Sequence, residues 1–114
     1  MNLEDYANQT LEWAGRKGIN KGFEAEGFHL AVEIGEFLQA VFKKRASQIN
    51  EKTSKPYTEY DVGLEFADGL INLLLMAKVE IPSVNLDEIF EEKMKINETR
   101  GVKTTMPDGR VIIR

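Results

Sequence analysis

Apolar residues recur along most of the chain with the period of amphipathic helices, and runs of strict alternation are few. We expect four helices, over residues 3–16, 24–44, 58–78 and 85–100. The three prolines all lie outside these periodic blocks, at Pro56, Pro82 and Pro107. Because proline inside a helix removes a hydrogen bond and clashes with the preceding turn, this placement favours an all-α fold.

Two of the predicted helices begin with residues that cap helix N-termini. Thr58 is followed three residues later by Asp61, and Asn85 is followed three residues later by Glu88. In this spacing the first side chain accepts a hydrogen bond from the first turn of the helix, which satisfies a backbone donor there. The two pairs therefore predict where the third and fourth helices start.

The remaining segments have the composition of connections. Residues 46–57 are polar and contain a Lys-Pro pair, which predicts a solvated loop. Residues 101–114 read as a turn with a short extended segment, and we expect a C-terminal tail there. A chain of 114 residues favours one domain, and a chain this small buries only about two-thirds of its unfolded surface. We therefore expect a single domain over residues 1–114 that associates with further copies.

The second and third predicted helices are apolar around most of their circumference, which predicts that both are buried. Each leaves one narrow polar sector. Glu33 and Glu36 lie side by side on the first helix of this pair, and Glu65 and Asp68 repeat the arrangement on the second. An ionised carboxylate in an apolar interior costs several kcal/mol, so four of them predict a bound cation. A solvated acidic stripe with outward ion pairs is the alternative.

The composition restricts which cation could bind. The chain has no cysteine and one histidine, so the ligands of a metal would be oxygen atoms. Hard oxygen ligands suit Mg²⁺, with Mn²⁺ as a substitute. A di-iron carboxylate bundle needs Glu-x-x-His pairs, and His29 completes none. If the two helices pack antiparallel, the four acids can converge into one magnesium site.

The fourth predicted helix carries three polar residues on its apolar face. Lys93, Asn97 and Arg100 lie at i, i+4 and i+7, among Leu86, Ile89, Phe90 and Ile96. Facing inward, these residues could neutralise the carboxylates directly. They could also bind an anion that the metal contacts, because arginine, lysine and asparagine together supply the donors that a polyphosphate needs.

Three ordered motifs resemble one known family. Glu33-Ile34-Gly35-Glu36, Glu65-Phe66-Ala67-Asp68 and the segment from Lys93 to Arg100 are similar to the ExxE, ExxD and KxxxNxxR signatures of the MazG-like all-α nucleoside triphosphate pyrophosphohydrolases. That superfamily includes the dimeric dUTPases and the dCTP pyrophosphatases. The resemblance covers residues 28–100. It implies a four- or five-helix MazG-like bundle that forms a homodimer or homotetramer, with active sites near subunit contacts.

The resemblance also implies an activity and roles for the motif residues. The activity would be Mg²⁺-dependent cleavage of a nucleoside triphosphate between the α and β phosphates, which releases the monophosphate and pyrophosphate. The metal ligands and catalytic acids would be Glu33, Glu36, Glu65 and Asp68, and the phosphate-binding residues would be Lys93, Asn97 and Arg100.

Two further positions bear on this assignment. Many family members carry an additional acid directly before the first glutamate of ExxE, where this chain has Val32. Activation of water would then depend on the metal or on one of the four acids. His29 lies one turn before Glu33 on the acidic sector; it could contact the substrate or hydrogen-bond a metal ligand.

Charge and hydropathy restrict the partners. The formal net charge of −4 argues against a general binder of nucleic acid or anionic membranes. No apolar run is long enough to span a bilayer and the first residues lack the features of a signal peptide, so we expect a cytoplasmic protein. The alternative function is a non-catalytic helical protein that binds metal or nucleotide, with residues 101–114 engaging a partner.

Overall fold

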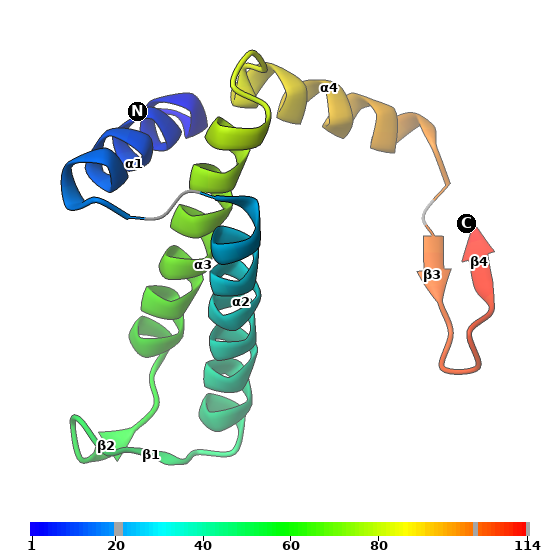
Figure 1. The fold of residues 1–114 in the computed structure, drawn as a ribbon. Coiled ribbons are helices and arrows are strands. Elements are labelled where there is room, and N and C mark those ends of the chain that lie inside the picture. Colours follow the sequence, from blue (N-terminus) through cyan, green and yellow to red (C-terminus); the bar gives the residue numbers. More distant parts are fainter. Residues whose placement is uncertain (20–21, 102, 114) are drawn as a thin grey trace. The chain divides into compact units, whose positions relative to one another are not determined.

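The computed structural model describes residues 1–19, 22–101 and 103–113. The chain divides into two compact units, Met1–Pro82 and Ser83–Arg114. In the described part, the first unit contains α1 (Leu3–Lys17), α2 (Phe23–Arg45), β1 (Ile49–Asn50), β2 (Lys55–Pro56) and α3 (Glu59–Glu80) (Figure 1). The second unit contains α4 (Leu86–Thr99), β3 (Lys103–Thr105) and β4 (Val111–Ile113).

The prediction of an all-α fold with a short extended C-terminal tail is confirmed. Each helix begins and ends within two residues of its predicted bounds. The segment 46–57, expected as a solvated loop, contains a small antiparallel pair of strands in which Ile49 lies opposite Pro56. In the tail, β3 and β4 form an antiparallel hairpin. The single domain over residues 1–114 stays a prediction.

The predicted caps begin α3 and α4. The backbone nitrogen of Asp61 donates to Thr58 Oγ1 at 3.3 Å, and the backbone nitrogen of Thr58 donates to Asp61 Oδ2 at 2.8 Å. Asn85 Oδ1 accepts from the backbone nitrogen of Glu88 at 3.0 Å. Asp61 shares the acidic sector of its helix, but its carboxylate is engaged in this capping box.

In the first unit α2 and α3 lie side by side and run antiparallel, and α1 packs against α3 (Figure 1). The contact face of α1 is built from small residues, because Ala7, Thr10 and Ala14 are its buried positions. On α3 the buried apolar residues are Leu74 and Leu75. Small side chains let the two helix backbones approach closely where they meet, but the helices also line an apolar cavity of about 470 Å³, with Trp13 on α1 and Phe66 and Ile71 on α3 in its wall.

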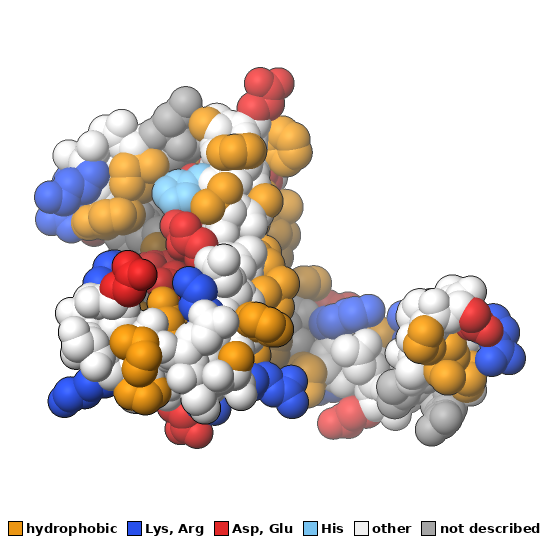
Figure 2. Space-filling view, turned by 90° about the horizontal axis from the view of Figure 1, so that it is seen from below, with side chains coloured by type: hydrophobic (Ala, Val, Ile, Leu, Met, Phe, Trp, Pro, Cys, Tyr) orange, Lys and Arg blue, Asp and Glu red, His pale blue; other side chains and the backbone are white. Residues whose placement is uncertain are grey.

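The prediction that the second and third helices are both buried is wrong for the single chain. On α3, Leu64 and Phe66 are each more than half exposed. The buried residues of α2 are Glu26 and Ala40, whereas Phe28, Leu38 and Phe42 are each more than 60% exposed. The reason is geometric, since α2 packs along α3 and the other sides of the helix have no such neighbour among the described residues. Figure 2 shows hydrophobic side chains at the surface of this unit.

One buried ion pair joins α1 to α3. Lys78 is buried in the last turns of α3, and its Nζ contacts Glu4 Oε1 in the first turn of α1. Lysine is almost never buried without a partner, because its ammonium group loses its hydration. The pair therefore sets where α1 lies along α3.

The second unit is built from α4 and the hairpin. The hairpin turn is closed by the backbone nitrogen of Met106, which donates to the carbonyl of Arg110 at 2.8 Å. Gly109 has a φ of 87°, a conformation that other residues adopt only with strain. Arg110 Nε lies 2.6 Å from Asp108 Oδ2 across the same turn. Within the described ranges, no helix of either unit has the length and apolar character needed to cross a bilayer.

The buried pair gives a prediction on stability. Replacing Glu4 with glutamine should lower the free energy of unfolding by about 3 kcal/mol, because the ammonium of Lys78 then stays buried without a counter-charge. Lys78→Met should cost less, since it leaves only the carboxylate of Glu4, whose side chain is 19% exposed. Urea unfolding followed by circular dichroism measures both. Equal losses in the two variants would contradict this account.

Candidate metal and anion sites

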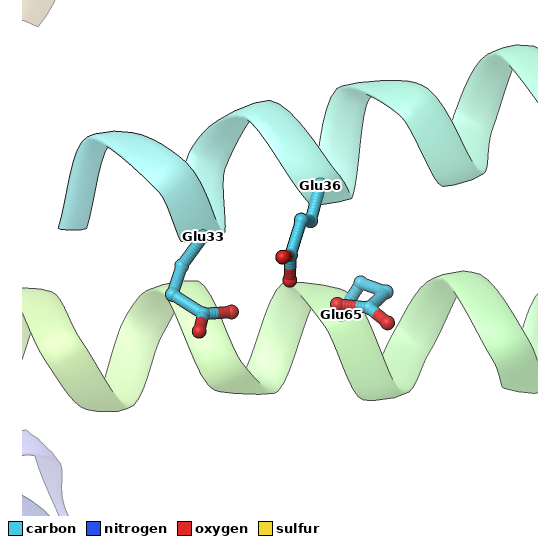
Figure 3. A group of neighbouring side chains, drawn as sticks. All are labelled: Glu33, Glu36 and Glu65. Carbon is cyan, nitrogen blue, oxygen red and sulfur yellow. The ribbon is translucent and has the colours of Figure 1, made fainter. Parts of the chain in front are cut away.

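Three acidic side chains from two helices meet in the first unit. Glu33 and Glu36 extend from α2 toward α3, and Glu65 extends from α3 (Figure 3). One carboxylate oxygen of each lies within 4.8 Å of the others. The antiparallel packing of α2 and α3 brings the two motifs to the same height, as the sequence predicted. We call these three residues the glutamate cluster.

Two carboxylate oxygens of the glutamate cluster are buried without a hydrogen bond from the described residues. Glu33 Oε2 and Glu65 Oε2 are buried, and among the described residues neither has a hydrogen-bond partner. Burial raises the pKa of Glu65, and the nearby charges of Glu36, Asp68 and Glu33 raise it further, while Lys52 lowers it. Each such oxygen costs free energy unless it is protonated or meets a positive charge.

Asp68, predicted as the fourth ligand, lies outside this cluster. It is exposed, and its carboxylate does not join the group of three within 4.8 Å. Three positions along a helix turn a residue by about 60° around the axis, so Asp68 lies beside Glu65 on the same side of α3, but its carboxylate stays outside the group of three. It is still close enough for its charge to raise the pKa of Glu65. Its role as a metal ligand stays a prediction.

His29 is attached to the glutamate cluster. Its Nε2 lies 2.9 Å from Glu33 Oε1, one turn along α2, and its side chain is about half exposed. The sequence allowed two roles for His29, contact with the substrate or a hydrogen bond to a metal ligand. The structure contains the hydrogen bond to a candidate ligand, Glu33. A bond of this kind holds the carboxylate in one orientation. Contact between His29 and a substrate stays a prediction.

Two charged residues near this site were not predicted. Glu26 is 2% exposed, with Oε1 buried and unpartnered among the residues described. Burial raises its pKa, and the neighbouring His29 lowers it. Glu26 lies seven residues before Glu33 and therefore on the same face of α2, so the helical wheel of the helix predicted over residues 24–44 already contained the signal. Lys52 lies between β1 and β2, and no local pattern places it near Glu65.

The predicted cationic residues group together in the second unit. Lys93, Asn97 and Arg100 line one cavity of about 400 Å³, together with Gly101 and Lys103. The spacing of the first three puts them on one face of α4, as expected. All three are exposed in the structure. We call the residues lining this cavity the cationic pocket.

The glutamate cluster and the cationic pocket lie in different units, so their union in one site stays a prediction. The glutamate cluster has a donor set that suits a divalent cation, without any contribution from the cationic pocket. Its donors are all carboxylate oxygens, and two of them are buried without a partner among the described residues. Mg²⁺ and Mn²⁺ prefer this donor set. Glu33, Glu36 and Glu65 are therefore the residues that would hold the ion.

In comparisons with known proteins, no protein-family model, curated protein or solved structure matches the chain. The similarity to the MazG-like family therefore depends on the three motifs and their spacing.

The glutamate cluster predicts a stabilising effect of divalent cations. Mg²⁺ or Mn²⁺ should raise the midpoint of thermal unfolding at neutral pH, because the folded cluster binds the ion and the unfolded chain does not. At a concentration 100 times the Kd, the gain is about 2.7 kcal/mol. Glu36→Gln should reduce the shift and barely change the metal-free midpoint, since Glu36 is exposed. NaCl at equal ionic strength controls for screening, and an equal shift with NaCl would contradict a bound ion.

The pKa of Glu65 predicts the direction of the pH effect. Its pKa in the folded chain lies above the ordinary value of 4.5, so the folded state binds this proton more tightly than the unfolded state does. Metal-free stability should therefore decrease as pH rises from 4 through the folded pKa, and Glu65→Gln should remove this part of the decrease. Thermal unfolding between pH 4 and 8 tests it. An identical pH profile in the variant would contradict the assignment.

Glu26 gives a separate prediction. Glu26→Gln should raise the free energy of unfolding at pH 7 by about 1 to 3 kcal/mol, because a neutral amide replaces a buried carboxylate that has an unpartnered oxygen. The gain should vanish below pH 4, where both states are protonated. The matched control is Glu24→Gln, an exposed position in the same turn. A loss of stability in Glu26→Gln would show that the carboxylate has a favourable partner.

Proposed function

We propose that this chain is a Mg²⁺-dependent nucleotide pyrophosphohydrolase that cleaves a nucleoside or deoxynucleoside triphosphate between its α and β phosphates. One observation carries the proposal. The glutamates of two separate motifs converge on one cluster, and two of their oxygens are buried without a partner among the described residues. The resemblance to the MazG-like family supplies the reaction, and the cationic pocket supplies donors for phosphate.

The glutamate cluster would hold the divalent cation, and the cation would activate the phosphate and the water. A divalent cation held by Glu33, Glu36 and Glu65 would neutralise their charge, polarise phosphoryl oxygens and lower the pKa of water. The position before Glu33 is Val32, which cannot accept a proton. Activation of the attacking water would then depend on the bound cation or on one of the acids acting through it.

Two other groups would position the reactants. The hydrogen bond from His29 holds Glu33 Oε1, so the free oxygen of Glu33 keeps a defined direction. In the cationic pocket, Lys93 and Arg100 would stabilise charge on the departing pyrophosphate, and Asn97 would donate a neutral hydrogen bond. The function requires both groups to act on one substrate molecule.

We further propose that the enzyme is a homodimer or homotetramer. The support is the apolar surface of α2, where Phe28, Leu38 and Phe42 are each more than 60% exposed. Exposed apolar surface on this scale is typical of an interface between subunits.

The scissile bond is the decisive test. Incubating the chain with a panel of nucleoside and deoxynucleoside triphosphates and Mg²⁺ should give the monophosphate and pyrophosphate, resolved by ion-exchange chromatography. Cleavage between the α and β phosphates is expected because the proposed reaction displaces pyrophosphate as one unit. Release of a diphosphate and orthophosphate would refute the proposed reaction.

Variants of the candidate ligands test whether the activity belongs to this chain and not to a contaminating enzyme. Calorimetry tests whether the chain binds a nucleotide without cleaving it. Glu36→Gln should lower turnover at least about 100-fold while the helical content persists, because removing a metal ligand weakens both the site and its chemistry. Asp68→Asn tests the fourth predicted ligand, and Glu92→Gln on α4 is the exposed control. If calorimetry shows binding of a nonhydrolysable triphosphate but no member of the panel is cleaved, the chain is a nucleotide-binding protein instead.

A further inference from the structure

The cationic pocket contains a residue that lies outside the three motifs. Lys93 and Asn97 come from α4 and Arg100 directly follows its last residue, whereas Lys103 is the first residue of β3. Gly101, which has no side chain, lines the cavity between them. The hairpin therefore adds a third cation to a pocket that the helix alone would line with two.

The position of Lys103 is set by strand pairing. In the hairpin Lys103 lies opposite Ile113, Thr104 opposite Ile112 and Thr105 opposite Val111. The turn is closed by the hydrogen bond between Met106 and Arg110 described above. Because Lys103 belongs to a paired strand, its backbone has a defined place within the hairpin. Lys103 lines the same cavity as the polar residues of the helix.

The cations of the pocket have no carboxylate partner within the part of the chain that the structure describes. The ion pairs found there join other residues, and none includes Lys93, Arg100 or Lys103. Three positive charges around one cavity repel each other unless an anion lies among them. The donors are a guanidinium fork, two ammonium groups and an amide, a set that matches several phosphate oxygens at once.

The charge and number of these donors favour a chain of phosphates over a single one. A phosphate monoester carries about 1.5 to 2 negative charges near neutral pH, fewer than the three positive charges of the pocket. A diphosphate or triphosphate has more charge and more acceptor oxygens. The cavity of about 400 Å³ lies within the usual size range of small-molecule sites.

We propose that Lys103 is a phosphate-binding residue, and that with Lys93, Asn97 and Arg100 it forms a site for a diphosphate or triphosphate chain. The site lies within Ser83–Arg114. The inference rests on the proposed function for the source of the ligand, because a nucleoside triphosphate and its pyrophosphate product share this chemistry. It also gives the C-terminal hairpin a role in binding the substrate.

Calorimetric titration of inorganic pyrophosphate into the full chain tests the site. A metal chelator is present throughout, so that the glutamate cluster cannot bind pyrophosphate through an ion. Lys103→Ala should weaken binding about tenfold, the effect of losing one charge-assisted hydrogen bond. The matched control is Lys95→Ala, an exposed lysine of α4 that does not line the cavity, and its affinity should stay within about twofold. Lys103→Arg should retain most of the affinity, and circular dichroism confirms the fold of each variant.

Three outcomes overturn the inference. These are wild-type affinity in Lys103→Ala, equal losses in Lys103→Ala and Lys95→Ala, and a wild-type chain that binds orthophosphate as tightly as pyrophosphate. A parallel titration with a nonhydrolysable nucleoside triphosphate distinguishes the two sources of the phosphate chain. Turnover assays keep the two proposals apart. Turnover with no effect of Lys103→Ala on pyrophosphate binding refutes only the role of Lys103, whereas a tenfold loss in a chain that cleaves no triphosphate refutes only the enzymatic function.

Discussion

The burial of carboxylate oxygens between α2 and α3 is the constraint on which the first unit depends. These two helices carry many apolar residues, yet Glu33 and Glu65 each place one oxygen where neither water nor a donor among the described residues reaches it. The antiparallel packing of α2 against α3 is also what brings the glutamates together. Fold and site therefore share the same contacts. A cation would relieve the repulsion and stabilise the packing at the same time.

The apolar surface of α2 and α3 has the same origin. A helix that is apolar around most of its circumference needs neighbours on several sides, and a unit of three helices supplies few. Phe28, Leu38, Phe42 and Tyr60 are all largely exposed in the single chain. The proposed association with further copies would cover these side chains without any change in the helices themselves.

Local signals predicted most of the fold, because the helix ends are encoded within a few residues. The pairs Thr58 with Asp61 and Asn85 with Glu88 marked two helix starts, and both form their predicted hydrogen bonds. The pairing of β1 with β2 was missed, since two-residue strands have no measurable period. The burial of α2 and α3 was predicted wrongly, because helical periodicity shows which faces are apolar and not how many neighbours a single chain provides.

The site was predictable only where it follows helical spacing. Glu33, Glu36 and Glu65 converge because i and i+3 positions share a face and the helices run antiparallel. Lys93, Asn97 and Arg100 share a cavity for the same reason. Lys103 and Lys52 could not be found in this way, because each depends on how a hairpin folds. Asp68 follows the motif but lies outside the cluster, since a shared motif does not determine where a side chain points.

Glu26 is a buried carboxylate that lies outside the glutamate cluster, so its burial needs a separate explanation. Proteins break local rules mainly at functional sites, and the glutamate cluster fits this pattern because a cation would offset its charge. Glu26 is more deeply buried than Glu33, and it lies outside the cluster of three. A cation held by the cluster therefore does not account for its burial. The nearby imidazole of His29 lowers its pKa, and His29 also contacts Glu33. Glu26 is thus linked to the site through one histidine, and its charge acts on the same residue that orients a candidate metal ligand.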